Sequence, residues 1–208
     1  MYKVISNTPD ERSSITYPWI WWDDAFTNDE LKKIEDTCSH EKMEKATIFG
    51  EEDINEIEKI RKTRIHFFKK DQATEWIFNK LNTTITIINE SYYNYNLNGY
   101  KTFQYSEYHA EENGKYDWHM DTLHGFHEKY SKDLTRKLSV VMCLSDPEKD
   151  FEGGEFQINM GNQDFPQTIL MKKGRIIVFP SYLIHRVKPV TKGIRKSIVI
   201  WVVGPKFI

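Results

Sequence analysis

The sequence is poor in the residues that build covalent frameworks or thiolate metal clusters. Its 208 residues include two cysteines, Cys38 and Cys143, too few for a disulfide network or a zinc–thiolate cluster. We expect both to be buried thiols in a reducing compartment. The amino terminus lacks the apolar run of a signal peptide, and no later stretch is long enough to cross a bilayer. These absences predict a cytoplasmic protein with no membrane partner.

A strong charge of one sign and internal repeats are also missing. The 29 basic and 31 acidic residues give a formal net charge of -2. This balance argues against nucleic-acid binding driven by bulk electrostatics, although it leaves a local basic patch open. No repeat and no low-complexity linker divides the chain. We therefore expect one domain over residues 1–208, and the sequence does not indicate its oligomeric state.

The amino-terminal half, residues 1–100, contains helical patterns and short strands that we expect to support the fold. Thr27 and Glu30 form a capping-box pattern, which predicts a helix from about Asn28 to His40. Asp71 is expected to cap a second helix that reaches Ile88. Strands are expected at residues 17–22 and 63–68. The charged segment 41–61 is predicted to be loosely packed, as a lid or as a solvated loop.

The second half, residues 101–208, changes to short strands separated by turn residues. The predicted strands are 103–108, 118–122, 138–144, 154–160, 168–171, 175–179, 185–190 and 197–203, with one of the breaks at Gly193. Regularly spaced strands with little helix between them are typical of an antiparallel sandwich or barrel. We predict a mainly β fold with flanking helices (α+β), in which residues 101–208 form a jelly roll, the double-stranded β-helix.

A histidine and a carboxylate stand two residues apart in one of these strands. Side chains alternate along a strand, so His119 and Asp121 are expected to share a face, with Trp118 and Met120 packed in the core. His185, from a distant strand, would complete two histidines and one carboxylate around an ion, the facial triad of non-haem Fe(II) oxygenases. Asp117 is expected on the same face and is the main rival ligand.

Several motifs follow one another in a recognisable order. They are Tyr108 and Tyr116 ahead of His119-Met120-Asp121, then segments 137–141, 151–156 and 174–180, then His185–Val190 followed by Gly193–Ser197, which contains Arg195. Together, over residues 103–204, they resemble the Fe(II)- and 2-oxoglutarate-dependent dioxygenases, and within them the prolyl 4-hydroxylase branch that includes the bacterial PKHD-type hydroxylases.

This resemblance implies a role for each matching residue. His119, Asp121 and His185 would hold Fe(II), and 2-oxoglutarate would chelate the metal and leave one position for O2. Arg195 offers two parallel charge-assisted hydrogen bonds to the distal carboxylate of 2-oxoglutarate. Tyrosine hydroxyls would donate to its carboxylates, with Tyr108 the first choice, Tyr116 the second and Tyr105 less favoured. Trp201 is expected in the core, and the resemblance suggests ascorbate as a reductant for the metal.

The implied activity is hydroxylation of an unactivated carbon, coupled to the conversion of 2-oxoglutarate to succinate and carbon dioxide. The resemblance favours a prolyl residue of a protein or peptide as substrate, while a free amino acid or another small molecule remains an alternative. From other classes, the chain could be a non-catalytic metal-retaining jelly-roll module or a zinc hydrolase, but neither has a use for Arg195. Segment 123–136, which contains His124 and His127, is expected to be either a loop closing over the substrate or a solvated connection.

Overall fold

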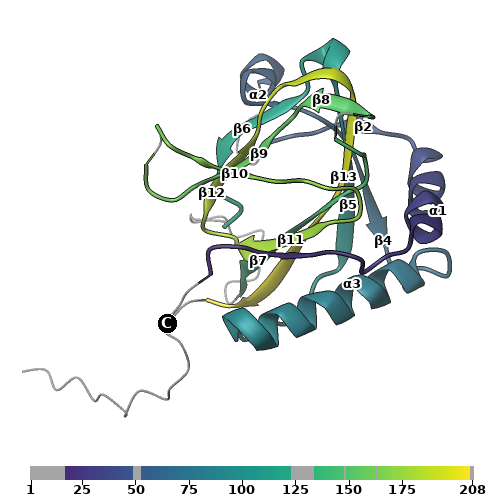
Figure 1. Ribbon diagram of the computed structural model, residues 1–208, viewed down its shortest axis with the longest axis vertical. Coiled ribbons are helices and arrows are strands. Elements are labelled where there is room, and N and C mark those ends of the chain that lie inside the picture. Colours follow the sequence, from purple (N-terminus) through teal and green to yellow (C-terminus); the bar gives the residue numbers. More distant parts are fainter. Residues whose placement is uncertain (1–16, 49–52, 123–133, 148, 163, 207–208) are drawn as a thin grey trace, which may run out of the picture.

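Two antiparallel β-sheets form the centre of the molecule (Figure 1). The computed structural model describes residues 17–48, 53–122, 134–147, 149–162 and 164–206. The 8-stranded sheet has the order β1 (Ile20–Trp22), β11 (Ile176–Pro180), β7 (Leu134–Cys143), β13 (Val190–Pro205), β5 (Thr102–His109), β4 (Arg64–Lys69) and β2 (Glu44–Lys45), with β8 (Phe151–Gly153) paired to β13. The 5-stranded sheet has the order β10 (Gln167–Ile169), β9 (Phe156–Asn159), β12 (Ile184–Val187), β6 (Lys115–His119) and β3 (Arg61–Lys62). The predicted jelly-roll architecture is confirmed.

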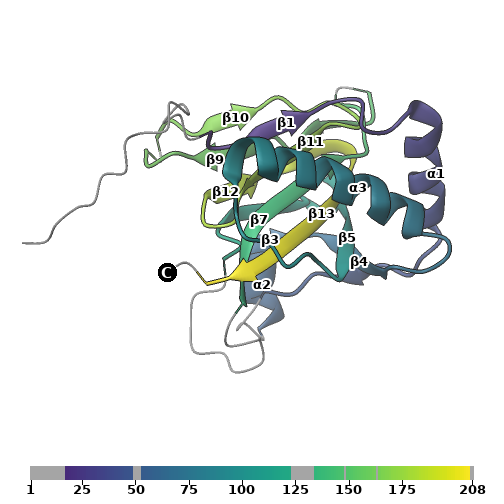
Figure 2. The same ribbon diagram turned by 90° about the horizontal axis from the view of Figure 1, so that it is seen from below.

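Helices cover the outer face of the 8-stranded sheet. Figures 1 and 2 show α1 (Asn28–Ser39) at one side of this sheet and α3 (Glu75–Ile88) lying across its strands. The predicted capping box starts α1, because the Thr27 hydroxyl accepts from the Glu30 amide and the Glu30 carboxylate accepts from the Thr27 amide. Ile34 of α1, Leu81 of α3 and Phe103 of β5 belong to one buried cluster. Because this cluster joins helices to sheet, it fixes the strands that carry half of the site described below.

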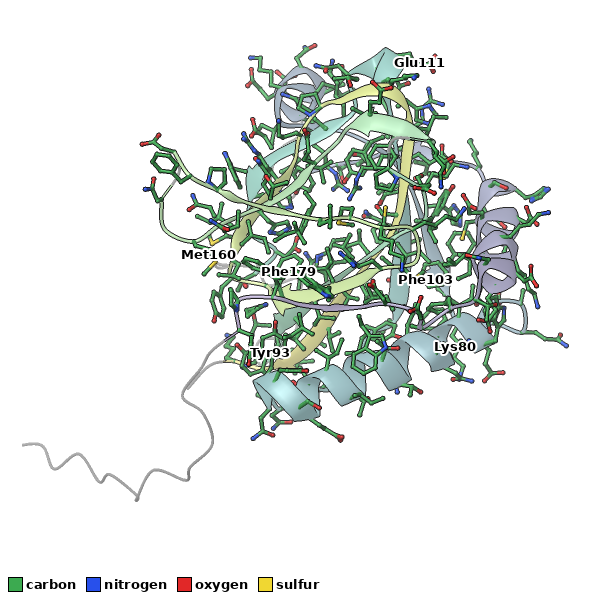
Figure 3. The ribbon with its side chains drawn as sticks, viewed as in Figure 1. Lys80, Tyr93, Phe103, Glu111, Met160 and Phe179 are labelled. Atoms are coloured by element: carbon green, nitrogen blue, oxygen red, sulfur yellow. The ribbon has the colours of Figure 1, made fainter. Side chains whose placement is uncertain are left out.

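A second apolar cluster lies between the two sheets. It contains Phe179 of β11 and Val141 of β7 from the larger sheet, with Phe156 of β9 and Val187 of β12 from the smaller one. Figure 3 labels Phe103, which packs on the helix side, and Phe179, which packs in this inner cluster. The alternation of side chains along each strand therefore separates a helix-facing core from an inner core between the sheets.

The segment 41–61 is more regular than the sequence predicted. It contributes β2, the short helix α2 (Ile54–Ile60) and the first residue of β3, while residues 49–52 lie outside the described part. The Asp53 carboxylate caps α2 by accepting from the Asn55 amide. Scattered isoleucines in a charged stretch gave no clear period, but Ile57 is buried. The prediction of a loosely packed excursion was therefore wrong for these elements.

The predicted break at Gly193 was also wrong, because β13 runs through it. Gly193 has a φ of 69°, and a Cβ atom there would lie 2.0 Å from the Asp150 carbonyl oxygen. A glycine that normally signals a turn here permits a close approach between β13 and the segment before β8. The result is a 16-residue strand that delivers both Arg195 and Trp201 to the space between the sheets.

Among the described residues, no helix is long and apolar enough to span a membrane.

Candidate active site

The structure brings His119, Asp121 and His185 together between the sheets. His119 of β6 and His185 of β12 are direct partners in the antiparallel pairing of these strands. The His185 Nε2 atom lies 3.4 Å from Asp121 Oδ2, and the His119 Nε2 atom lies 3.8 Å from Asp121 Oδ1. One ligand atom from each residue can be chosen so that all lie within 4.8 Å of one another. Three donor atoms at such separations fit around a single metal ion.

Each histidine ring is held by a hydrogen bond from its other nitrogen. His119 Nδ1 lies 2.7 Å from the Asp117 carbonyl oxygen, and His185 Nδ1 lies 2.9 Å from the Leu183 carbonyl oxygen. A carbonyl oxygen accepts a hydrogen bond from the Nδ1–H group, so a neutral ring keeps its lone pair on Nε2. Burial, with a contribution from the neighbouring His185, lowers the pKa of His119 to about 3. Both observations fit a neutral imidazole that can bind a metal.

Asp121 is positioned by the larger sheet rather than by β6. The strand ends at His119, so the predicted regular alternation as far as Asp121 was wrong. The Asp121 backbone amide donates to the Ser181 carbonyl oxygen at 3.0 Å, and the Ser139 hydroxyl donates to Asp121 Oδ2 at 2.7 Å. Burial alone would raise the pKa of this carboxyl group, but His185, His119 and the Ser139 hydrogen bond outweigh burial and lower the pKa. The side chain is therefore an ionised, oriented carboxylate.

Met120 and Trp118, both predicted in the core beside the triad, do not lie there. Met120 is exposed, with 45% of its surface accessible, so its predicted place in the core was wrong. Trp118 is half-buried and stacks with the Arg186 guanidinium, whose central carbon lies 4.3 Å from the ring centre. Asp117, the rival ligand, accepts from the Trp118 backbone amide at 2.9 Å and is not one of the three clustered residues. The outer face of the smaller sheet is open where we expected core packing.

Arg195 is buried in the same space with most of its hydrogen-bonding capacity unused. It is 1% exposed, and its Nη1 group donates to the Ser197 hydroxyl at 3.3 Å. Its Nε and Nη2 groups have no hydrogen-bond partner among the described residues. A buried guanidinium without an anion is costly, so these two donors are suited to the two oxygens of a carboxylate. The residue fits the distal carboxylate of 2-oxoglutarate.

The three tyrosines occupy distinct places. Tyr108 is buried and lies opposite Arg195 in the pairing of β5 with β13, and its ring centre is 5.2 Å from the guanidinium carbon. Tyr116 stacks on His119 with ring centres 3.4 Å apart. Burial raises the pKa of Tyr116 to about 12, so its hydroxyl stays protonated. Tyr105 faces the helix-side core, where it donates to Glu107. Tyr108 and Tyr116 therefore line the site and Tyr105 does not.

One cavity is lined by both the triad and Arg195. Three of the lining residues that were not predicted from the sequence carry polar side-chain groups: Arg61, Gln104 and Trp201. Trp201 was expected in the core, but it is half-buried at the cavity wall. Arg61 lies in the segment that was expected to be loosely packed. Its charge gave no signal in a stretch where most neighbours are also charged.

Residues 103–203 match the family described as the 2OG-Fe(II) oxygenase superfamily. The match covers 101 of the 208 residues, slightly less than half of the chain, and over these residues the chain is similar to that superfamily. A similar curated protein is a PKHD-type hydroxylase of Synechococcus sp. (strain CC9311), 35% identical over 93 residues, which cover 45% of this chain and 38% of the relative. The match therefore spans well under half of the relative's length. The predicted resemblance to this superfamily and its PKHD branch is confirmed.

Solved structures extend the likeness of the fold to nearly the whole chain. A prolyl-4-hydroxylase of Pseudomonas putida superposes with a TM-score of 0.68 at 18% identity and covers 92% of this chain and 95% of its own. A prolyl hydroxylase from Trichoplax adhaerens, in complex with a peptide fragment of the hypoxia inducible factor oxygen degradation domain, also gives a TM-score of 0.68 at 18% identity, covering 89% and 83%. At this identity the comparison establishes the fold, and the chain shares the double-stranded β-helix of these oxygenases.

Proposed function

We propose that this chain is an Fe(II)- and 2-oxoglutarate-dependent oxygenase that hydroxylates an unactivated carbon. The observation that carries the proposal is a pair of features in one cavity. One is a triad of two histidines and an ionised carboxylate, and the other is a buried arginine with two unpaired donors. A structural metal site would have no need of the arginine, and a zinc hydrolase would need a general acid or base beside the metal-bound water.

The triad is suited to hold Fe(II) with part of its coordination sphere open. His119 and His185 would bind through Nε2, since Nδ1 of each is tied to a backbone carbonyl group. Asp121 would bind through a carboxylate oxygen, kept in place by Ser139. Together, Fe(II), 2-oxoglutarate and O2 would supply the oxidation, in which 2-oxoglutarate becomes succinate and carbon dioxide and the substrate gains a hydroxyl group. The chain itself supplies position, dryness and charge.

Arg195 would bind the distal carboxylate of 2-oxoglutarate. Its planar fork presents two N–H groups, and its Cδ atom lies close to the position of a Cβ atom on Gly154, so the backbone leaves it little freedom. Tyr108 packs beside the guanidinium and is placed to donate to a carboxylate of the co-substrate. Apolar walls such as Val199 and Phe156 exclude water from these charge-assisted hydrogen bonds and so strengthen them.

A prolyl residue of a protein or peptide is the substrate that we propose. Support comes from the relatives, which are described as PKHD-type hydroxylases, and from solved prolyl hydroxylases of the same fold, one of them holding a peptide. A free amino acid is the second candidate. We place the protein in the reducing cytoplasm, in keeping with two free buried cysteines, Cys38 and Cys143, and propose ascorbate as a reductant.

Anaerobic titration tests the proposal directly. Addition of 2-oxoglutarate to the Fe(II)-loaded protein should produce the weak visible charge-transfer band of the metal chelate. His185→Ala should abolish the band, and Arg195→Gln should shift its midpoint to much higher 2-oxoglutarate concentration. Succinate release with a mass increase of one oxygen in candidate peptides would then identify the substrate. Absence of the band in the wild type, together with hydrolysis supported by zinc, would overturn the proposal.

A further inference from the structure

A second buried arginine lines the cavity, and the co-substrate does not account for it. Arg61 comes from β3 of the smaller sheet, whereas Arg195 comes from β13 of the larger one. Arg61 is 8% exposed, and its Nη1 and Nη2 groups donate to the Thr47 carbonyl oxygen at 3.1 Å and the Gln104 side-chain oxygen at 3.4 Å. Its Nε group has no hydrogen-bond partner. Among the described residues, this cation therefore has neutral acceptors and no ion pair.

Arg61 is held next to the metal triad by a stack of planar groups. Its guanidinium carbon lies 4.5 Å from the centre of the Tyr116 ring, and that ring stacks on His119. Arg61 and Tyr116 are also direct partners in the pairing of β3 with β6. The Trp201 indole nitrogen, at the wall of the same cavity, is a second buried donor without a partner. Only the Tyr116 ring thus separates the fixed cation of Arg61 from His119, and the unpaired N–H of Trp201 lies at the wall of the same cavity.

The charges in the cavity point to the chemistry of the missing partner. The charged lining residues are Arg61, Arg195 and Asp121. With a divalent metal the positive charges number four, and Asp121 with the two carboxylates of 2-oxoglutarate supplies three negative charges. One positive charge stays unbalanced in a site where an unpaired ion is costly. Because Arg195 is suited to the distal carboxylate of the co-substrate, the unbalanced charge is that of Arg61.

We propose that Arg61 receives a carboxylate of the substrate, so that this enzyme selects substrates with a carboxylate close to the hydroxylated carbon. This inference rests on the proposed oxygenase function and specifies the substrate class for the same site. The Nε group of Arg61 donates to one carboxylate oxygen, and the Trp201 indole N–H is the second donor. The carboxylate belongs either to the α-carboxyl group of a free or carboxy-terminal amino acid or to an aspartate or glutamate beside the target residue of a peptide.

Matched pairs of ligands test the inference by binding alone, without turnover. The full chain is loaded with Mn(II) and 2-oxoglutarate under anaerobic conditions and titrated calorimetrically. One pair is N-acetyl-proline with N-acetyl-prolinamide, and the other is acetyl-Asp-Pro-amide with acetyl-Asn-Pro-amide. In one of these pairs, the carboxylate should bind about tenfold to a hundredfold more tightly than its neutral partner, as one charge-assisted hydrogen bond in a buried site predicts. The pair that discriminates identifies the source of the carboxylate.

Variants then assign the preference to Arg61. Arg61→Gln should abolish the preference for the carboxylate ligand over its neutral partner. Arg61→Lys, which keeps the charge but not the planar fork, should reduce this preference. Arg64→Gln is the control, because Arg64 lies on β4, the next strand in sequence but part of the other sheet. Its side chain is 40% exposed and pairs with Glu112 outside the cavity. The control should keep the full preference. All three variants should bind Mn(II) and 2-oxoglutarate like the wild type.

Three results would overturn the inference. Equal binding of carboxylate and amide in both pairs would show that the substrate brings no charge to Arg61. A loss of 2-oxoglutarate binding in Arg61→Gln as large as that in Arg195→Gln would place Arg61 in the co-substrate site. In both cases the wild type still forms the metal chelate, and the oxygenase proposal stands. If the wild type does not bind 2-oxoglutarate with the metal at all, the proposed function fails and the inference fails with it.

Discussion

Gly154→Ala should weaken 2-oxoglutarate binding while leaving the metal triad intact. Gly154 has a φ of 62°, and a Cβ atom there would lie 3.0 Å from the Arg195 Cδ atom and 2.9 Å from the Val190 Cγ2 atom. The new methyl group must therefore displace the arginine stem or the valine. Since Arg195 is fully buried, its guanidinium cannot move without losing alignment with the co-substrate carboxylate.

The expected magnitude has two parts. A non-glycine residue in the left-handed region costs about 1–2 kcal/mol, and overpacking a buried contact costs about 1–3 kcal/mol more. Gly161→Ala is a matched control, since Gly161 also has a positive φ, of 101°, but a Cβ atom there meets nothing within 4 Å. The control should lose only the backbone part. Loss of one of the two hydrogen bonds from Arg195 should raise the dissociation constant of 2-oxoglutarate about tenfold or more.

Urea unfolding gives the free energy of unfolding of both glycine variants, and calorimetric titration gives the affinities for Mn(II) and then for 2-oxoglutarate. Gly154→Ala should be less stable than Gly161→Ala and bind 2-oxoglutarate more weakly, with Mn(II) affinity unchanged in both. Equal destabilisation of the two variants with wild-type affinity for 2-oxoglutarate would refute the reasoning, because it would show that Arg195 does not depend on the space above Gly154.

Three other outcomes follow from the described contacts. Ser139→Ala should lower metal affinity about 10-fold to 100-fold by freeing the Asp121 carboxylate, measured by metal titration. Asp23→Asn should lower the free energy of unfolding at pH 7 by about 1–2 kcal/mol, because Asp23 pairs with Arg175 through two hydrogen bonds. Asp24→Asn is the control and should have little effect, because the Asp24 side chain is 89% exposed. The Arg175 hydrogen bond lowers the pKa of Asp23. The contribution of this ion pair to the free energy of unfolding should therefore be complete above the ordinary aspartate pKa of about 3.9 and decline as the pH falls below that value. This pH dependence should be absent in Asp23→Asn.

The sequence predicted the triad and Arg195 because these residues stand in motifs with a fixed order. The prediction that His119 and Asp121 share a face succeeded for a different reason from the one given. The strand ends at His119, and the chain turns so that Asp121 is bound by Ser139 of the larger sheet and by Ser181, which directly follows β11. Local alternation cannot foresee this arrangement, because the partners lie 18 residues or more away in sequence.

Arg61 and Trp201 escaped prediction because their positions depend on sheet pairing. Arg61 reaches the cavity only because the two-residue strand β3 pairs with β6, opposite Tyr116. A two-residue strand has no period that a sequence pattern could show. Trp201 lies on an apolar strand where every second residue faces the helices, and Ile200 and Val202 take those positions. The alternation of β13 was clear, but the sequence did not show that its other face borders a cavity.

The site is divided between the two sheets, which makes its geometry depend on the inner core. His119 and His185 come from the smaller sheet, while Arg195 and the serine that orients Asp121 come from the larger one. The distance from the metal position to Arg195 is therefore set by packing between the sheets. Phe179 contributes to this packing through an edge contact with His185, in which the ring centres lie 4.8 Å apart. A close-packed interior transmits a change of volume at such a contact to both sheets. In the proposed complex, the two ends of 2-oxoglutarate would contact different sheets. Shortening a side chain in this inner cluster should therefore alter the fit of 2-oxoglutarate more than the affinity for the metal alone.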